Sequence, residues 1–197
     1  MNFLKATVFW LLSLTWGCIM SVIGLVVAFF LLITGHKPKI FGWSLHFFVG
    51  RSWGGVNLGP VIITNIGAET TQFHEHGHGL QNCLWGPLFP FVIALPSMYR
   101  YHLRNFNYES KKTYAIVMLF VILLILCLGY IPTFVFNLYW LGILISLLII
   151  YDNIIFVWAW LVEIPKYANY QRPLYDSIWF EGQATRWGNK VFDYLKE

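Results

Sequence analysis

Residues 70–83 read TTQFHEHGHGLQNC, a stretch that places three histidines and a glutamate within five positions of a mostly apolar chain. Periodicity and flanking residues predict a helix over residues 68–82. On that helix His74 and His78 project from one face, about one turn apart. This is the HExxH arrangement, in which two imidazoles bind zinc and the intervening Glu75 acts as general base toward zinc-bound water.

The third histidine of the motif has a different position on the helix. His76 lies about 200° round the helix axis from His74. We therefore expect His76 either to contact one of the metal-binding residues without binding the metal itself, or to face solvent. A histidine cluster without metal, or a metal site without hydrolysis, is the alternative to a catalytic reading.

A catalytic zinc site usually takes a third protein ligand, commonly a histidine or a carboxylate. One candidate is Glu181, in the segment LYDSIWFEGQATRWGNK (residues 174–190). The other is Asp152, in LIIYDNIIFVW, where the acidic group interrupts a long apolar run. Ionisable groups inside a membrane are costly and commonly functional, so Asp152 is an alternative ligand.

The composition around the motif indicates an integral membrane protein. Of the 197 residues, 58% are hydrophobic and only 11% are charged, whereas about a quarter of a typical soluble chain is charged. Residues 8–34 carry no charge and exceed the roughly 20 residues that cross a bilayer as a helix. We expect this segment to be a retained transmembrane anchor.

Further elements are expected on both sides of the motif. Two β-favouring runs, Leu45 to Val49 and Val56 to Thr64, flank GRSWGG and predict a small β-hairpin within residues 42–64, with Pro60 placing the second run at an edge or bulge. Residues 83–98 are apolar but contain three prolines, which favours a re-entrant or in-plane segment over a span.

The expected fold is a single all-α membrane domain over residues 1–197. It has about three transmembrane helices (8–34, 113–135 and 138–161), the re-entrant segment, the small hairpin, the motif helix and a C-terminal helix over 174–195. Basic residues in the loop 99–112 and in the C-terminal segment predict that these parts face the cytoplasm. A re-entrant 83–98 places the motif on the cytoplasmic side too, whereas a spanning 83–98 would place it outside. Membrane lipid is an expected partner. Nucleic acid is not, because no basic stripe is present.

The two separated motifs resemble those of a known enzyme class. HEHGH followed far downstream by FEGQAT resembles the gluzincin zinc peptidases, whose second motif reads ExxA followed by a polar residue. The resemblance implies that His74, His78 and Glu181 bind zinc and that Glu75 is the base. Thr185 stands where many gluzincins have an aspartate that contacts a ligand histidine, so this contact is in question.

A longer pattern covers most of residues 42–190. It combines GWSLHFFVGRSWGGVNLGPVIIT, HEHGHGLQNCLWGPLFPFVIALPSMYRY and YDSIWFEGQATRWG, and it is similar to a group of uncharacterised bacterial integral-membrane proteins. The two resemblances imply peptide-bond hydrolysis at the plasma membrane, acting on a peptide or membrane protein.

The sequence is also compatible with one mode of peptide recognition and with two other functions. Residues 56–64 would hold an extended peptide as an added strand. Site-2-type intramembrane proteases pair HExxH with a distant aspartate on a transmembrane helix, which would make Asp152 the third ligand, although Asn153 departs from their pattern. A non-enzymatic metal-binding or scaffold protein is the other alternative. The sequence predicts no particular oligomeric state.

Overall fold

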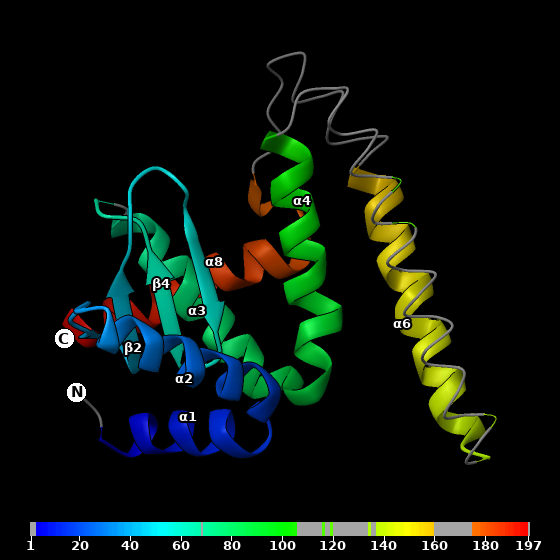
Figure 1. Ribbon diagram of the computed structural model, residues 1–197, viewed down its shortest axis with the longest axis horizontal. Helices are drawn as coiled ribbons and strands as arrows, with labels where there is room; N and C mark the ends of the chain where they lie inside the picture. The colour runs from blue at the N-terminus through cyan, green and yellow to red at the C-terminus, as the bar shows by residue number, and fades with distance from the viewer. Residues whose placement is uncertain are drawn as a thin grey trace. The chain divides into compact units, whose positions relative to one another are not determined.

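The computed structural model describes residues 3–67, 69–105, 116, 119, 134, 137–159 and 175–196. The chain divides into two compact units, one formed by Met1–Pro90 with Leu174–Glu197 and the other by Phe91–Pro173. The first unit holds these helices and strands: α1 (Phe3–Thr15), α2 (Cys18–Ile33), β1 (Lys39–Phe41), β2 (Ser44–Phe48), β3 (Gly55–Leu58), β4 (Val61–Thr64), α3 (Glu69–Trp85) and α8 (Trp179–Lys196) (Figure 1).

A four-stranded sheet of order β1-β2-β4-β3 forms the middle of the first unit. β1 and β2 pair antiparallel, β2 and β4 pair parallel, and β3 and β4 pair antiparallel. Gly59, with a φ of 67°, makes the tight turn between β3 and β4, because a residue without Cβ adopts this backbone conformation at little cost. The strand order places β3 at one end of the sheet.

Helices cover both faces of this sheet (Figure 1). On one face Ala28 of α2 packs with Phe47, Val61 and Ile63. On the other face α3 lies against β3 and β4. All four residues of β4 are buried, as expected for a strand that is covered on both sides.

The second unit contains α4 (Leu95–Asn105) and α6 (Tyr139–Trp158), preceded by a π-helical turn, Pro90–Ala94. The hydroxyl of Tyr99 on α4 donates to the carbonyl of Asp152 at 3.0 Å. The hydroxyl of Tyr151 donates to the carbonyl of Val92, also at 3.0 Å. The first bond connects α4 to α6, and the second connects α6 to the π-helical turn.

The expected all-α membrane fold with about three spanning helices is wrong. A mixed sheet forms the middle of the first unit. Among the described residues, α6 alone is long and apolar enough to cross a bilayer, with α1 and α2 as a second candidate only if the bent pair counts as one span. The anchor predicted over residues 8–34 is two helices bent by 100°. Most of the expected span 113–135 lies outside the described residues.

Two smaller expectations also differ from the structure. Residues 45–49 and 56–64 do not form a hairpin with each other, because β2 pairs in parallel with β4 and the hairpin is β3–β4. Pro60 lies in the turn of that hairpin, where a missing N–H costs no ladder bond. Segment 83–98 is not a single apolar insertion. It comprises the end of α3, the 3-10 turn Gly86–Leu88, the π-helical turn and the start of α4.

Candidate metal centre

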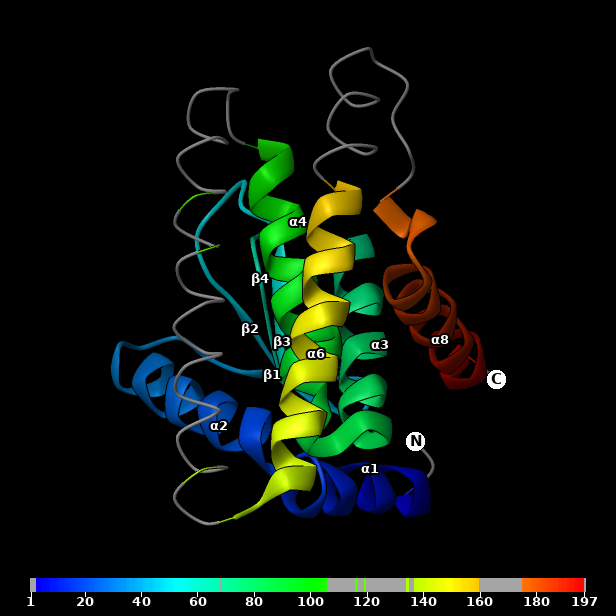
Figure 2. The ribbon, with the colours of Figure 1, turned by 90° about the vertical axis from the view of Figure 1, so that its right-hand side faces the viewer.

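The site depends on a close approach between α3 and α8 that two glycines permit. A Cβ at Gly77 would collide with the carbonyl of Ala184, and a Cβ at Gly188 would collide with the carbonyl of Phe73. Each helix thus contributes one glycine at a point where the other backbone passes. Figure 2 shows the two helices side by side. Larger side chains at these positions would hold the helices apart.

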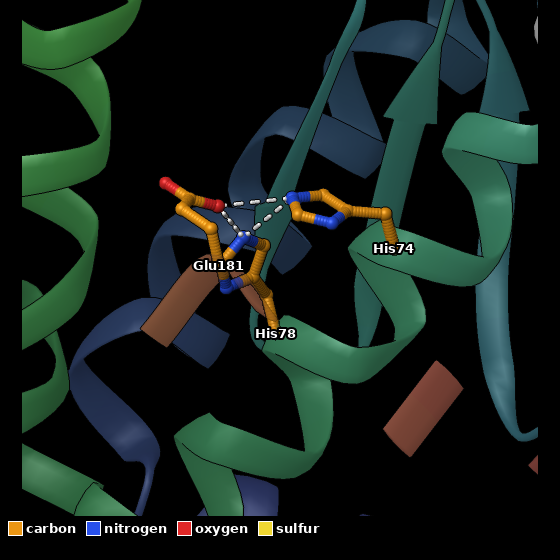
Figure 3. A group of neighbouring side chains, drawn as sticks. All are labelled: His74, His78 and Glu181. Carbon is orange, nitrogen blue, oxygen red and sulfur yellow. Dashed lines mark hydrogen bonds and ion pairs between the residues drawn. The ribbon is translucent and has the colours of Figure 1, made fainter. Parts of the chain in front are cut away.

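Three ligand-type atoms meet where these helices approach (Figure 3). The Nε2 atoms of His74 and His78 are 3.0 Å apart. Oε2 of Glu181 lies 3.0 Å from the first and 3.1 Å from the second. Glu181 is fully buried and His78 nearly so. The three atoms form an almost equilateral triangle, although 103 residues separate His78 from Glu181.

This group could hold a metal ion. A tetrahedral ion with bonds of about 2.0–2.1 Å separates its ligand atoms by about 3.3 Å, so the observed triangle is only slightly tighter than one face of that tetrahedron. Two imidazoles and one carboxylate are also a ligand set found in catalytic zinc sites, where three protein ligands leave a fourth position for water or substrate. Both the spacing and the donor types therefore fit.

The other ring nitrogens of both histidines are held by neutral polar groups. Nδ1 of His74 lies 2.8 Å from Oγ1 of Thr185. Nδ1 of His78 lies 2.7 Å from Oε1 of Gln81. Such contacts orient a ligand imidazole and leave its other nitrogen for the metal. Thr185 therefore makes the contact that the sequence comparison with gluzincins left in question.

Gln81 also links the two helices. Its amide nitrogen donates to the carbonyl of Phe180 at 2.8 Å and to Oε1 of Gln183 at 2.9 Å. Phe180 directly precedes Glu181 in α8. The side chain of Gln81 thus contacts His78 on α3 and also bonds to the backbone of α8 next to Glu181.

The close contact between the histidines and Glu181 shifts the pKa values of His78 and Glu181 in opposite directions. Burial alone would lower the pKa of His78, but hydrogen bonding to Glu181 and the charges of Glu181 and Glu75 raise it to about 9. Burial alone would raise the pKa of Glu181, but hydrogen bonds from His74 and His78 hold it well below its usual range. The carboxylate therefore stays ionised, as a metal ligand must be.

Glu75 is buried beside the triangle, on the side of α3 that faces the sheet. Burial raises the pKa of its carboxyl group, whereas the neighbouring His78 and His74 act in the opposite direction. A Cβ added at Gly55 of β3 would lie 2.8 Å from Oε1 of Glu75. The carboxyl group is therefore adjacent to the backbone of the end strand of the sheet.

His76 faces away from the triangle, as its helical position predicts, but it does not face solvent or contact a ligand. Its ring is 1% exposed and packs against Phe9, Phe41 and Trp43. Nδ1 lies 2.8 Å from Oγ of Ser44. Burial lowers the pKa of His76 to about 4, so the ring is neutral and belongs to the core between α3 and the sheet.

The remaining candidate ligand, Asp152, is buried on α6 in the second unit. The group of His74, His78 and Glu181 forms entirely within the first unit. Gln81, Gly77 and Gly188 were not singled out from the sequence. The position of Gln81, three residues after His78, is a signal that was available, because residues at i and i+3 share a helix face.

No protein-family model, no curated protein and no solved structure matches the chain.

Proposed function

We propose that this protein is a zinc-dependent peptidase that acts at a membrane surface, with His74, His78 and Glu181 as zinc ligands and Glu75 as general base. The observation that carries the proposal is the triangle of ligand atoms, whose sides are 3.0 to 3.1 Å. The adjacent buried Glu75 extends it from metal binding to hydrolysis.

Zinc is favoured over harder ions by the donor set. Magnesium and calcium prefer all-oxygen sites with six or more ligands, many of them water or carbonyl oxygen. Imidazole nitrogen suits zinc and other late transition metals. The buried, closely spaced pair of imidazoles with a single carboxylate therefore favours zinc.

The chain supplies a base and positioned ligands for the reaction. Bound zinc would lower the pKa of a bound water to about 7 and polarise the scissile carbonyl. Glu75 accepts a proton from the attacking water and returns it to the amine that leaves. Its buried environment, which raises its pKa, strengthens it as a base near neutral pH. Thr185 and Gln81 hold the imidazoles in orientation.

Peptide recognition at β3 is supported by its place in the sheet. β3 is the strand at one end of the order β1-β2-β4-β3. Asn65 donates to the carbonyl of Gly54 across the β3–β4 hairpin, and antiparallel pairs alternate between bonded and open positions. The backbone groups of Gly55 and Asn57 then point away from β4, and of these two residues Gly55 is partly exposed whereas Asn57 is buried. An extended peptide added there would pass beside Glu75.

A membrane location is supported by the apolar surface of α6. Its 20 residues form a candidate span with a hydropathy of 2.2, and only 22% of its apolar 18-residue window is buried. Ser146 and Asn153 on this helix donate to carbonyls four residues earlier, so both side chains have a donor that is bonded without water.

Metal analysis with a peptidase assay tests the proposal. Purified wild type should carry one zinc per chain and cleave members of a mixture of internally quenched peptides. His74→Ala and Glu181→Ala should lose both the metal and cleavage. Asp152→Asn, which removes a carboxylate from the other unit, is the matched control and should keep both. Wild-type protein without stoichiometric zinc would contradict the proposal.

Glu75→Gln separates a peptidase from a metal-binding scaffold. This substitution keeps the size of the side chain but removes its basicity. It should retain zinc and lose cleavage by roughly 100-fold or more, since a positioned general base typically contributes 10²–10⁴-fold. Unchanged cleavage would assign hydrolysis to another group. Zinc bound without cleavage by the wild type would favour the scaffold.

A further inference from the structure

The helix pair α1–α2 presents mainly small and polar side chains to the rest of its unit. Two of its seven buried residues, Phe9 and Met20, are large. The other five are small and lie along its inner face: Ser13, Gly17, Ser21, Gly24 and Ala28. A Cβ at Gly24 would collide with the carbonyl of Leu58 in β3. The helices thus approach the sheet through small residues, as helices do in membranes, where no hydrophobic force separates inner from outer surfaces.

The outer face of the pair is the reverse, because it carries the large apolar side chains. Sixteen large hydrophobic residues between Phe3 and Ile33 are exposed, among them Leu11 at 60%, Val22 at 60% and Phe30 at 61%. Together they expose an area on the order of 1,000 Å², above the roughly 300–600 Å² of the largest apolar patch on a typical soluble monomer. A helix pair that folds against water would bury these residues and expose the small ones.

Every side-chain hydroxyl and indole N–H between residues 6 and 34 has a partner within the chain. The exposed hydroxyls of Thr7, Thr15 and Thr34 each donate to the carbonyl four residues earlier. Ser13 and Ser21 bond to inner partners. The indoles of Trp10 and Trp16 donate to the carbonyls of Trp43 and Leu84. The outer face therefore has no unsatisfied hydroxyl or indole donor. Such satisfaction within the chain is required in hydrocarbon, where no water can accept the hydrogen bond, but not at a surface that faces water.

We propose that α1 and α2 insert into one leaflet of a lipid bilayer with this outer face in the acyl-chain region, and that they do not cross it. α1 has 13 residues and α2 has 16. At a rise of 1.5 Å per residue they are about 20 and 24 Å long, and the hydrocarbon core is about 30 Å thick. The pair bends by 100° at residues 16–17, so α2 runs back from the bend and does not continue the direction of α1 (Figure 1). Such a bend would return both ends of the pair to the same leaflet.

The charges at the two ends fit this placement. Lys5 lies in the first turn of α1 and is exposed, and Lys37 and Lys39 follow α2 and are also exposed. No charged residue lies between Lys5 and Lys37. Lysines at both ends of an inserted pair would reach the phosphate groups of one leaflet, which attracts basic residues when its lipids are anionic.

Contacts between the pair α1–α2 and α3 link the proposed insertion to the metal centre. Phe9 of α1 packs against His76 on α3, and Asn82 of α3 donates to the carbonyl of Gly17. The helix that carries His74 and His78 is therefore held directly against the inserted pair. Attachment of this kind is independent of whether the metal site hydrolyses peptides.

A double-cysteine labelling experiment distinguishes insertion from crossing. Lys5→Cys and Lys37→Cys are introduced together into a full-length chain with Cys18→Ala, Cys83→Ser and Cys127→Ala, which is reconstituted into sealed vesicles of phosphatidylcholine and phosphatidylglycerol. A membrane-impermeant maleimide should then give chains with two adducts or none by intact mass, whichever way each molecule is oriented. One adduct on most chains would mean that the pair crosses the bilayer. Vesicles opened with detergent should give two adducts on all chains.

A second experiment identifies what covers the outer face. A nitrobenzoxadiazole label on Val26→Cys in the same cysteine-free chain should show blue-shifted emission that phospholipids with brominated acyl chains quench. The same label on Arg51→Cys, an exposed position in the loop after β2, should instead be quenched by aqueous iodide. Iodide quenching at position 26 would overturn the proposal. A shielded label that neither quencher reaches would show that a second copy of the chain covers this face, which also overturns it.

Discussion

Replacement of Gly77 by alanine should separate α3 from α8 and disrupt the metal centre without altering a ligand. The added Cβ would collide with the carbonyl of Ala184 and lie 2.5 Å from its carbonyl carbon, where ordinary contacts begin at 3.4 Å. The helices must therefore separate by at least about 0.9 Å, the difference between these distances. Metal–ligand distances are tolerated within roughly ±0.2 Å. The required shift is more than four times this tolerance.

Zinc affinity measured by competition with a chromogenic chelator should consequently fall by more than 100-fold in Gly77→Ala, beyond the 10- to 100-fold typical of changes around a ligand. The free energy of unfolding should fall by about 1–3 kcal/mol, as for other overpacked interiors. Gly79→Ala is the matched control. Its Cβ would lie 3.2 Å from the amide of Asn57 and from the carbonyl of Gly59, and 3.3 Å from the ring of Phe9. None of these groups belongs to α8, so zinc affinity should stay near wild type. A folded Gly77→Ala protein with wild-type affinity would refute the reasoning.

Three further outcomes are expected. Thr185→Val removes the hydroxyl next to Nδ1 of His74 at nearly constant volume, so zinc affinity should fall 10- to 100-fold; an unchanged affinity would mean that this contact does not orient the ligand. The pKa of about 9 for His78 in the metal-free site means that zinc must displace a proton below that pH. Its apparent affinity should therefore rise about tenfold per pH unit up to about 9 and then level off, and a titration series with no pH dependence would contradict this. His76→Ala should lower the free energy of unfolding by about 2–4 kcal/mol, because it leaves a cavity among Phe9, Phe41 and Trp43, and it should leave zinc stoichiometry unchanged by metal analysis. Loss of zinc in a folded His76→Ala protein would move this residue into the site.

Part of the candidate site follows from local sequence alone. A spacing of four residues places His74 and His78 on one helix face whatever surrounds the helix, and the same geometry turns His76 away. Glu181 was one of two candidate third ligands, and only the resemblance favoured it over Asp152, because nothing local in its segment separates a ligand from a surface carboxylate. Its meeting with the histidines depends on a helix–helix contact across about a hundred residues of chain.

The composition of residues 8–34 shows their apolar character but not their course. Hydropathy and length fit a straight span equally well. The bend at residues 16–17, and the burial of Ser13, Ser21 and Gly24 against the sheet and α3, come from contacts with distant residues such as Leu58 and Asn82. The parallel pairing of β2 with β4 has the same origin, since hairpin signals in the sequence describe only neighbouring strands.

The sequence by itself therefore determined the periodic features of this protein: the motif helix, the shared face of its two histidines and the apolar helices. Only the tertiary structure decided which distant groups meet. Gly77 and Gly188 illustrate the physical reason. A glycine within a helix lowers helix propensity, so from the sequence alone it is expected to destabilise the helix. Its effect is favourable only once another backbone occupies the space of the missing Cβ, and here that backbone brings Glu181 to the histidines.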